Sequence, residues 1–137
     1  MNTQNPHDYC IEMQVRDYEL DIQSIVNNSV YQNYLEHARH EFLITKNIDF
    51  ARLHEEGVDL VVTRIEIDFK QPLKSRDKFI VSVTCEKDGL LKLQFNQAIY
   101  RLPDMKLMVQ GKVTGVALRN GRPVKPTDIS ELQTILM

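Results

Sequence analysis

The sequence has no apolar run near the roughly 20 residues that a membrane-spanning helix needs, so no transmembrane segment is expected. No run of like charge stands out, and the formal net charge of −2 argues against broad binding to nucleic acid or to an anionic membrane. The first ten residues lack the basic start and apolar core of a signal peptide. We therefore expect a cytoplasmic protein with neither nucleic acid nor membrane as a partner.

Cysteine is scarce: Cys10 and Cys85 lie far apart and have no CxxC spacing, which predicts thiols in a reducing compartment. The sequence also has no glycine-rich phosphate loop, no serine-centred elbow and no HExxH motif. His37, His40 and Glu41 are close in sequence, but they fall on the solvated side of a predicted helix and no distant third ligand suggests itself. No metal and no cofactor are expected.

Two hydrophobic periods dominate the first half of the chain, which at 137 residues fits a single domain over 1–137 without repeat or linker. Apolar residues alternate with polar ones over 9–17, and this period of two predicts a strand. From about Asn28 to Lys46 the period becomes helical. The apolar stripe of this helix is Val30, Tyr31, Tyr34, Leu35, Ala38, Phe42 and Leu43. The opposite, solvated side is Gln32, Asn33, Glu36, His37, Arg39 and His40.

The second half of the chain reads almost entirely as strands. A short helix over 50–56, closed by Gly57, comes first. Strands are then predicted over 58–70, 78–86, 90–101 and 106–119, with a final helix that starts at Thr127 or Asp128 and runs to about Leu136. This order predicts an α+β domain with the long helix packed on one face of an antiparallel sheet. One helix leaves apolar surface uncovered, so a homodimer or homotetramer is expected.

The junction between the first strand and the long helix carries one acid, Asp21, in a short polar turn. The start of a helix presents backbone N–H groups without intrahelical partners, and the helix dipole places partial positive charge there. A carboxylate beside such groups serves either chemistry or an ordinary Asx turn or cap. The spacing leaves both readings open. Asn27 and Asn28, just before the helix, are good N-cap residues.

This stretch, VRDYELDIQSIVNNSVYQNYLEHAR, resembles the signature of hotdog-fold acyl-CoA thioesterases of the 4-hydroxybenzoyl-CoA thioesterase type. The longer run is most similar to their acyl-lipid thioesterase branch. The matching positions are Asp21, Val26, Asn27, Asn28, Tyr31, Tyr34, Glu36, Ala38 and Arg39. Downstream, Phe69-Lys70-Gln71-Pro72-Leu73 with Asp77, and Gly121-Arg122-Pro123, are also similar to the family pattern. The resemblance covers about residues 10–126 and implies the hotdog fold, an antiparallel sheet wrapped around one long helix.

The resemblance implies hydrolysis of a fatty acyl thioester of coenzyme A or of acyl carrier protein. Asp21 is then the general base or the nucleophile, and backbone N–H groups around Val30 and Tyr31 polarise the thioester carbonyl. Asn27 or Asn28 orients water or caps the helix. Coenzyme A enters only as part of the substrate.

Substrate contacts are expected from a second set of residues. Tyr34 belongs to the apolar stripe, so it is expected first in the core and second along the substrate. Coenzyme A phosphates need a basic surface, and Arg64 is the leading candidate. The other basic candidates are Lys70, Arg101, Lys112 and Arg119.

Two departures from the family pattern keep alternatives open: Ser24 stands where most members have glycine, and Ile25 where many have histidine. Loss of the glycine bears on the turn that positions Asp21. One alternative is a binding module that has the fold without turnover. The other is a hotdog hydratase or dehydratase, which commonly uses a histidine with an acid. Only His7 precedes the helix here.

Overall fold

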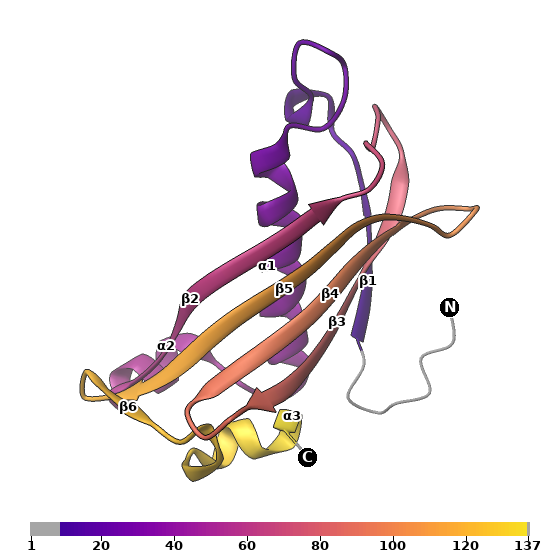
Figure 1. Ribbon diagram of the computed structural model, residues 1–137. Coiled ribbons are helices and arrows are strands. Elements are labelled where there is room, and N and C mark those ends of the chain that lie inside the picture. Colours follow the sequence, from indigo (N-terminus) through magenta and orange to yellow (C-terminus); the bar gives the residue numbers. More distant parts are fainter. Residues whose placement is uncertain (1–8, 137) are drawn as a thin grey trace.

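Six antiparallel strands form one curled sheet around a long helix in this computed structural model, which describes residues 9–136 (Figure 1). The spatial order is β1-β3-β4-β5-β2, and β6 pairs with the end of β5. The strands are β1 (Tyr9–Gln14), β2 (Val58–Phe69), β3 (Lys78–Asp88), β4 (Lys92–Arg101), β5 (Lys106–Arg119) and β6 (Arg122–Val124). The helices are α1 (Asn28–Thr45), α2 (Phe50–Glu55) and α3 (Gln133–Leu136). The predicted α+β hotdog architecture is confirmed, whereas His7 lies outside the described residues.

Helix α1 runs along one face of the sheet, behind the strands in Figure 1, and the predicted apolar stripe is the side it buries. Its N-cap is Asn27, whose side chain accepts a hydrogen bond from the Ser29 N–H. Gly111 of β5 lets the helix approach closely, because a Cβ there would lie 2.9 Å from Leu35 Cδ1. One position differs from the expectation: Arg39, predicted on the solvated side, is 7% exposed.

Strand β2 contains a bulge, and the bulge explains why apolar residues do not alternate regularly along the strand. A bulge between Val62 and Arg64 shifts the register with β5, so the alternation of side chains is reset there. Leu60 and Val62 before the bulge share the α1 side with Ile65, Ile67 and Phe69 after it. Strand β2 is also an edge of the sheet, and several of its apolar side chains are exposed. They are Val61, Val62, Ile65 and Phe69.

The turns follow the predicted glycines with small shifts. Strand β3 extends to Asp88, the turn occupies 89–91, and β4 begins at Lys92 rather than at Leu90. Asn120 and Gly121 both have positive φ, as the tight turn between β5 and β6 requires. Cys10 and Cys85 form no disulfide, and burial raises the pKa of the Cys85 thiol to about 12.

The predicted C-terminal helix is broken into three short pieces. They are 3-10 turns at Pro126–Asp128 and Ser130–Leu132, followed by α3. Ile129 between them is extended, and its side chain is buried together with those of Leu132 and Ile135. Burying these three apolar side chains against the core sets the path of the segment, and a continuous helix is lost. In residues 9–136 no helix is both long and apolar enough to cross a membrane.

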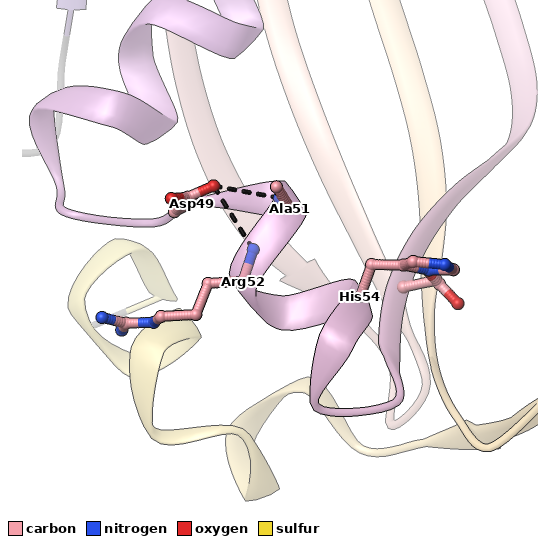
Figure 2. A network of polar contacts seen from close by, with 5 residues as sticks. Asp49, Ala51, Arg52 and His54 are labelled. Atoms are coloured by element: carbon pink, nitrogen blue, oxygen red, sulfur yellow. Dashed lines mark hydrogen bonds and ion pairs between the residues drawn. The ribbon is translucent and has the colours of Figure 1, made fainter.

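Helix α2 is short and depends on its cap. The Asp49 carboxylate accepts hydrogen bonds from the N–H groups of Ala51 and Arg52, at 2.9 and 3.4 Å (Figure 2). These bonds satisfy two donors that have no partner within the helix. At the other end, His54 lies 2.6 Å from an oxygen of Asp59 on β2. This contact holds helix α2 next to the start of β2, at the end of α1 away from Asp21 (Figure 1).

Candidate active site

The turn that carries Asp21 is a small closed loop ahead of α1. Leu20 forms an antiparallel bridge with Val26, and the Asp21 N–H donates to the Ile25 carbonyl at 2.8 Å. The half-buried Asp21 carboxylate accepts from the Gln23 N–H at 2.8 Å and from the Ile25 N–H at 3.4 Å, both through Oδ1. Within residues 9–136, no hydrogen bond engages Oδ2. Oδ1 therefore forms an Asx turn, whereas Oδ2 remains available to accept a proton.

Ser24 explains why the family pattern has glycine at this point of the turn. Its φ is +64°, in the left-handed region, and its N–H donates to the Asp21 carbonyl at 3.0 Å. A serine held there costs about 1 kcal/mol relative to glycine. The turn is nevertheless formed, so the loss of glycine leaves Asp21 in a closed loop.

The first turn of α1 offers fewer open donors than expected. The Val30 N–H, predicted to face the substrate, already donates to the Asn27 carbonyl at 2.9 Å, and the Ser29 N–H donates to the Asn27 side chain at 3.1 Å. Asn27 is therefore occupied as the cap. In the described part of the chain, the Asn28 N–H has no hydrogen-bond partner. It is the donor at the helix start that remains available.

A cleft of about 210 Å³ opens beside this helix start. Its walls come from the Asp21 loop, from α1 and from the segment after β2, and they include Ile25, Asn28, Tyr31, Phe69 and Lys70. The Tyr31 hydroxyl accepts a hydrogen bond from the Leu73 N–H at 3.0 Å, and the Tyr31 ring packs 5.5 Å from that of Phe69. Tyr31 thus holds one wall, and burial raises the pKa of its hydroxyl.

Tyr34 and Arg64 do not line this cleft, and neither do Asp21, Asn27 and Val30. Tyr34 is 2% exposed, and its hydroxyl donates to Glu19 Oε1 at 2.8 Å. Burial, followed by the hydrogen bond to Glu19, raises the Tyr34 pKa. Arg64 follows the bulge of β2 and lies 3.4 Å from Glu66 on the outer face of the sheet. Of the predicted cations, Lys70 is the one that lines the cleft.

Glu19 holds the Asp21 loop in position, a role that the sequence patterns above did not predict. Its carbonyl accepts from the Asn27 N–H at 3.0 Å, while its carboxylate accepts from the Arg16 N–H at 2.8 Å as well as from Tyr34. It therefore ties both ends of the Asp21 loop to the helix. A signal was present, because an acid three residues after Arg16 is the spacing of a capping box.

The His37, His40 and Glu41 side chains, close in sequence but not expected to bind a metal, do not converge. His37 lies 3.9 Å from Glu41, and the His40 ring packs 5.2 Å from that of Phe50. Across residues 9–136 there is no group of three or more histidine, cysteine, aspartate or glutamate side chains that could hold a metal ion.

This arrangement of a curled sheet around one helix, with an acid-bearing loop before the helix, defines a hotdog protein. A family model described as "Thioesterase-like superfamily" matches residues 15–133, and the chain belongs to this family. The resemblance found in the sequence is thereby confirmed.

Relatives and solved structures agree with this assignment. The chain is 37% identical over 116 residues to an acyl-acyl carrier protein thioesterase, ATL3, of Arabidopsis thaliana. The matched region covers 84% of this chain and 61% of that protein. It is 31% identical to a putative esterase of Aquifex aeolicus, over 64% of this chain and 68% of that one. The chain spans about three fifths of the length of the curated plant relatives it matches.

The fold is also found in solved structures. A 1,4-dihydroxy-2-naphthoyl-CoA thioesterase from Synechocystis superposes with a TM-score of 0.86 at 16% identity, over 94% of this chain and 95% of that one. At that level of identity the likeness concerns the fold alone.

Proposed function

We propose that the protein hydrolyses acyl thioesters of coenzyme A or of acyl carrier protein and releases a carboxylic acid, most fittingly a fatty acid. One observation carries the proposal: Asp21 keeps one carboxylate oxygen open in a loop that closes onto the start of α1. Ile25, the residue that bonds to Asp21 across the loop, lines the cleft at this helix start. Membership in the thioesterase-like superfamily supports the reaction class.

In the proposed reaction Asp21 is a general base. Its open oxygen takes a proton from water while the water oxygen attacks the thioester carbon. The carbonyl oxygen becomes negative and is stabilised by the Asn28 N–H with the positive end of the α1 dipole. The carbon–sulfur bond then breaks, and the thiolate takes up the proton. The products are one carboxylic acid and one thiol. The Asn28 side chain, which lines the cleft, orients the water.

The decisive experiment replaces Asp21 by asparagine, which keeps the shape and the accepting oxygen but removes the base. Release of free thiol from acyl-CoA is expected to fall by about 100-fold or more in kcat with KM little changed. Asp17→Asn is the matched control, because Asp17 lies in the same loop region and, among residues 9–136, its carboxylate accepts a hydrogen bond only from the exposed Ser75 hydroxyl. Hydrolysis by Asp21→Asn at the wild-type rate would refute the mechanism.

The same assay separates the alternatives. A hydratase would add water to an unsaturated acyl thioester without releasing thiol, and a binding module would retain the ligand unchanged. A single turnover in ¹⁸O-labelled water addresses the role of Asp21. A general base leaves ¹⁸O in the acid and none in the Asp21 carboxylate, whereas a nucleophile allows labelling of the carboxylate through an anhydride.

We further propose that the working unit contains a homodimer formed along β2. This edge strand has no partner on its outer side within residues 9–136, and it exposes Val61, Val62 and Ile65 by 41–45%. An exposed apolar edge is a template for pairing with a second copy. Light scattering after gel filtration is expected to give the mass of a dimer or a tetramer. The variant Val61→Lys is expected to shift the population toward monomer, and Tyr18→Lys, at an exposed site away from β2, serves as the control.

A further inference from the structure

A second cavity, of about 270 Å³, lies far from the cleft, between the C-terminal half of α1, α2 and the sheet. Most of its walls are apolar. They include Leu43, Phe50, Leu60, Val62, Leu93 and Phe95. The cavity spans β2, β5 and β4, which are successive strands of the sheet. Its volume holds roughly nine groups of the size of a water molecule.

Arg39 is the unusual residue in this cavity. Its side chain lines the cavity, yet the residue is only 7% exposed. One guanidinium nitrogen donates to Gln97 Oε1 at 3.1 Å, and Gln97 in turn donates to the Leu35 carbonyl at 2.9 Å. A guanidinium has five N–H donors, and among the described residues Arg39 forms no ion pair within 4.0 Å. An oxygen atom of a ligand would stabilise this buried cation by accepting hydrogen bonds from its remaining N–H donors.

We propose that this cavity binds the acyl group of the thioester and that Arg39 selects acyl groups carrying a neutral oxygen, a hydroxyl or a ketone, toward their far end. The inference rests on the proposed thioester hydrolysis. A carboxylate is disfavoured in the same place because Glu36 also lines the cavity. Burial lowers the pKa of Arg39, the negative charge of Glu36 acts in the opposite direction, and the same charge repels a second anion.

The distance from the β2 edge to the Arg39 guanidinium determines how long an acyl chain must be to reach it. Gln97, which holds the guanidinium, is on β4, two strands in from the β2 edge. Strands are about 4.8 Å apart, so the guanidinium lies about 10 Å from that edge. An extended chain advances roughly 3.5 Å for every three bonds, so about eight or nine bonds cover the distance. The bonds between the β2 edge and the reacting carbon add to this count, so the expected acyl groups are longer than about ten carbons.

The acyl chain enters from the β2 edge rather than through the protomer. Inside one protomer, Leu35 is 1% exposed and packs against Gly111, which closes the route along α1 from the cleft to the cavity. At the edge, Val61 and Val62 are exposed at the mouth of the cavity. In an antiparallel β2–β2 dimer, this end of the strand lies beside the end that carries the partner's Phe69, next to the partner's cleft. One subunit then cleaves the thioester while the other holds its chain.

The test compares acyl-CoAs of about ten to sixteen carbons, each chain ending in a methyl, a hydroxyl or a carboxylate group. At the chain length that reaches Arg39, wild-type kcat/KM is expected to be about tenfold higher for the hydroxylated chain than for the unsubstituted chain, the scale of a charge-assisted hydrogen bond. Arg39→Met is expected to reduce this ratio to about one. Arg52 on α2 (Figure 2) is exposed and does not line the cavity, so Arg52→Met is expected to keep the wild-type ratio.

Two further variants keep the test decisive. If Arg39→Met fails to fold, Arg39→Lys preserves the charge without the planar fork, and its ratio is expected to fall at least threefold. Glu36→Gln is expected to increase hydrolysis of the carboxylate-ended chain several-fold. An unchanged ratio in both Arg39 variants, or a wild-type preference for the carboxylate-ended chain, overturns the proposal.

Binding of inert analogues distinguishes this inference from the proposed function. Thioethers of coenzyme A that carry the unsubstituted or the hydroxylated chain of the length that reaches Arg39 contain no thioester bond to hydrolyse, and calorimetry measures their affinity. The hydroxylated thioether is expected to bind about tenfold more tightly to the wild type and equally to Arg39→Met. If no thioester is cleaved but this difference is found, the hydrolysis fails and the Arg39 site stands. If thioesters are cleaved but the two thioethers bind the wild type equally, the proposed hydrolysis stands and the Arg39 site is refuted.

Discussion

Removing the Tyr34 hydroxyl tests whether the Asp21 loop is held by a buried hydrogen bond. Tyr34→Phe keeps the ring, which packs 4.7 Å from Phe79, and deletes only the donor to Glu19. The ring fills the same space, so no cavity forms. The change therefore isolates one polar contact between the loop and α1.

The magnitude follows from the burial of both partners. Glu19 is 7% exposed and Tyr34 is 2% exposed, and they are 2.8 Å apart. Hydrogen bonds to a charged group contribute about 1.5–3 kcal/mol. After the change the carboxylate keeps the Arg16 N–H at 2.8 Å, and the Arg16 guanidinium lies at 3.7 Å in an exposed position. We expect a loss of about 2 kcal/mol in the free energy of unfolding, at the middle of that range.

Urea unfolding at fixed protein concentration measures this loss, since dimerisation would make stability depend on concentration. Tyr18→Phe is the control, because Tyr18 is 79% exposed, and it is expected to change stability by no more than about 0.5 kcal/mol. A looser loop is also expected to lower kcat more than it raises KM. If Tyr34→Phe is as stable as Tyr18→Phe, the hydrogen bond does not hold the loop and the reasoning is refuted.

Further predictions concern the turns, the helix–sheet contact and one histidine. Ser24→Gly is expected to gain about 1 kcal/mol in urea unfolding by relieving the left-handed φ of +64°. Asp49→Ala, which removes the cap of α2, is expected to lose about 1 kcal/mol in the same assay, and an unchanged stability would contradict the cap. Gly111→Ala is expected to cost about 1–3 kcal/mol, measured likewise, because its Cβ would overlap a buried leucine methyl. The hydrogen bond that the His54 ring donates to Asp59 raises the pKa of His54, so the stabilisation by this pair is full below the ordinary histidine pKa and is lost as pH rises through the raised value. NMR titration of the His54 ring is expected to show the raised pKa, and Asp59→Asn is expected to return it to the ordinary range.

The cleft and the Arg39 cavity lie at opposite ends of α1 and β2, and this separation gives the protein its proposed division of labour. Asp21 and Asn28 are at the start of α1, whereas Arg39 is eleven residues further, about 17 Å along the helix. Leu35 closes the space between them. Pairing along β2 is the arrangement that brings the two ends together, one from each copy.

The sequence by itself determined the elements, because they depend on local periodicity and capping. The alternation over 9–17, the helical stripe from Asn28 and the Asn120-Gly121 turn each report a backbone preference of neighbouring residues. The Asp21 loop could be located from the same stretch, because its acid precedes a strong N-cap by six residues. The position of Ser24 in a strained turn was visible as a departure from glycine.

Only the tertiary structure decided which side chains are buried and with which partners. Arg39 has the spacing of a solvated residue, yet β4 places Gln97 against it from 58 residues away. Tyr34 and Glu19 meet across the loop, and the bulge at Val62 turns Arg64 away from the cleft. Burial and pairing of this kind depend on how distant segments pack, which local preference does not encode. For that reason the loop that carries Asp21 could be located from the sequence, whereas the cavity around Arg39 could not.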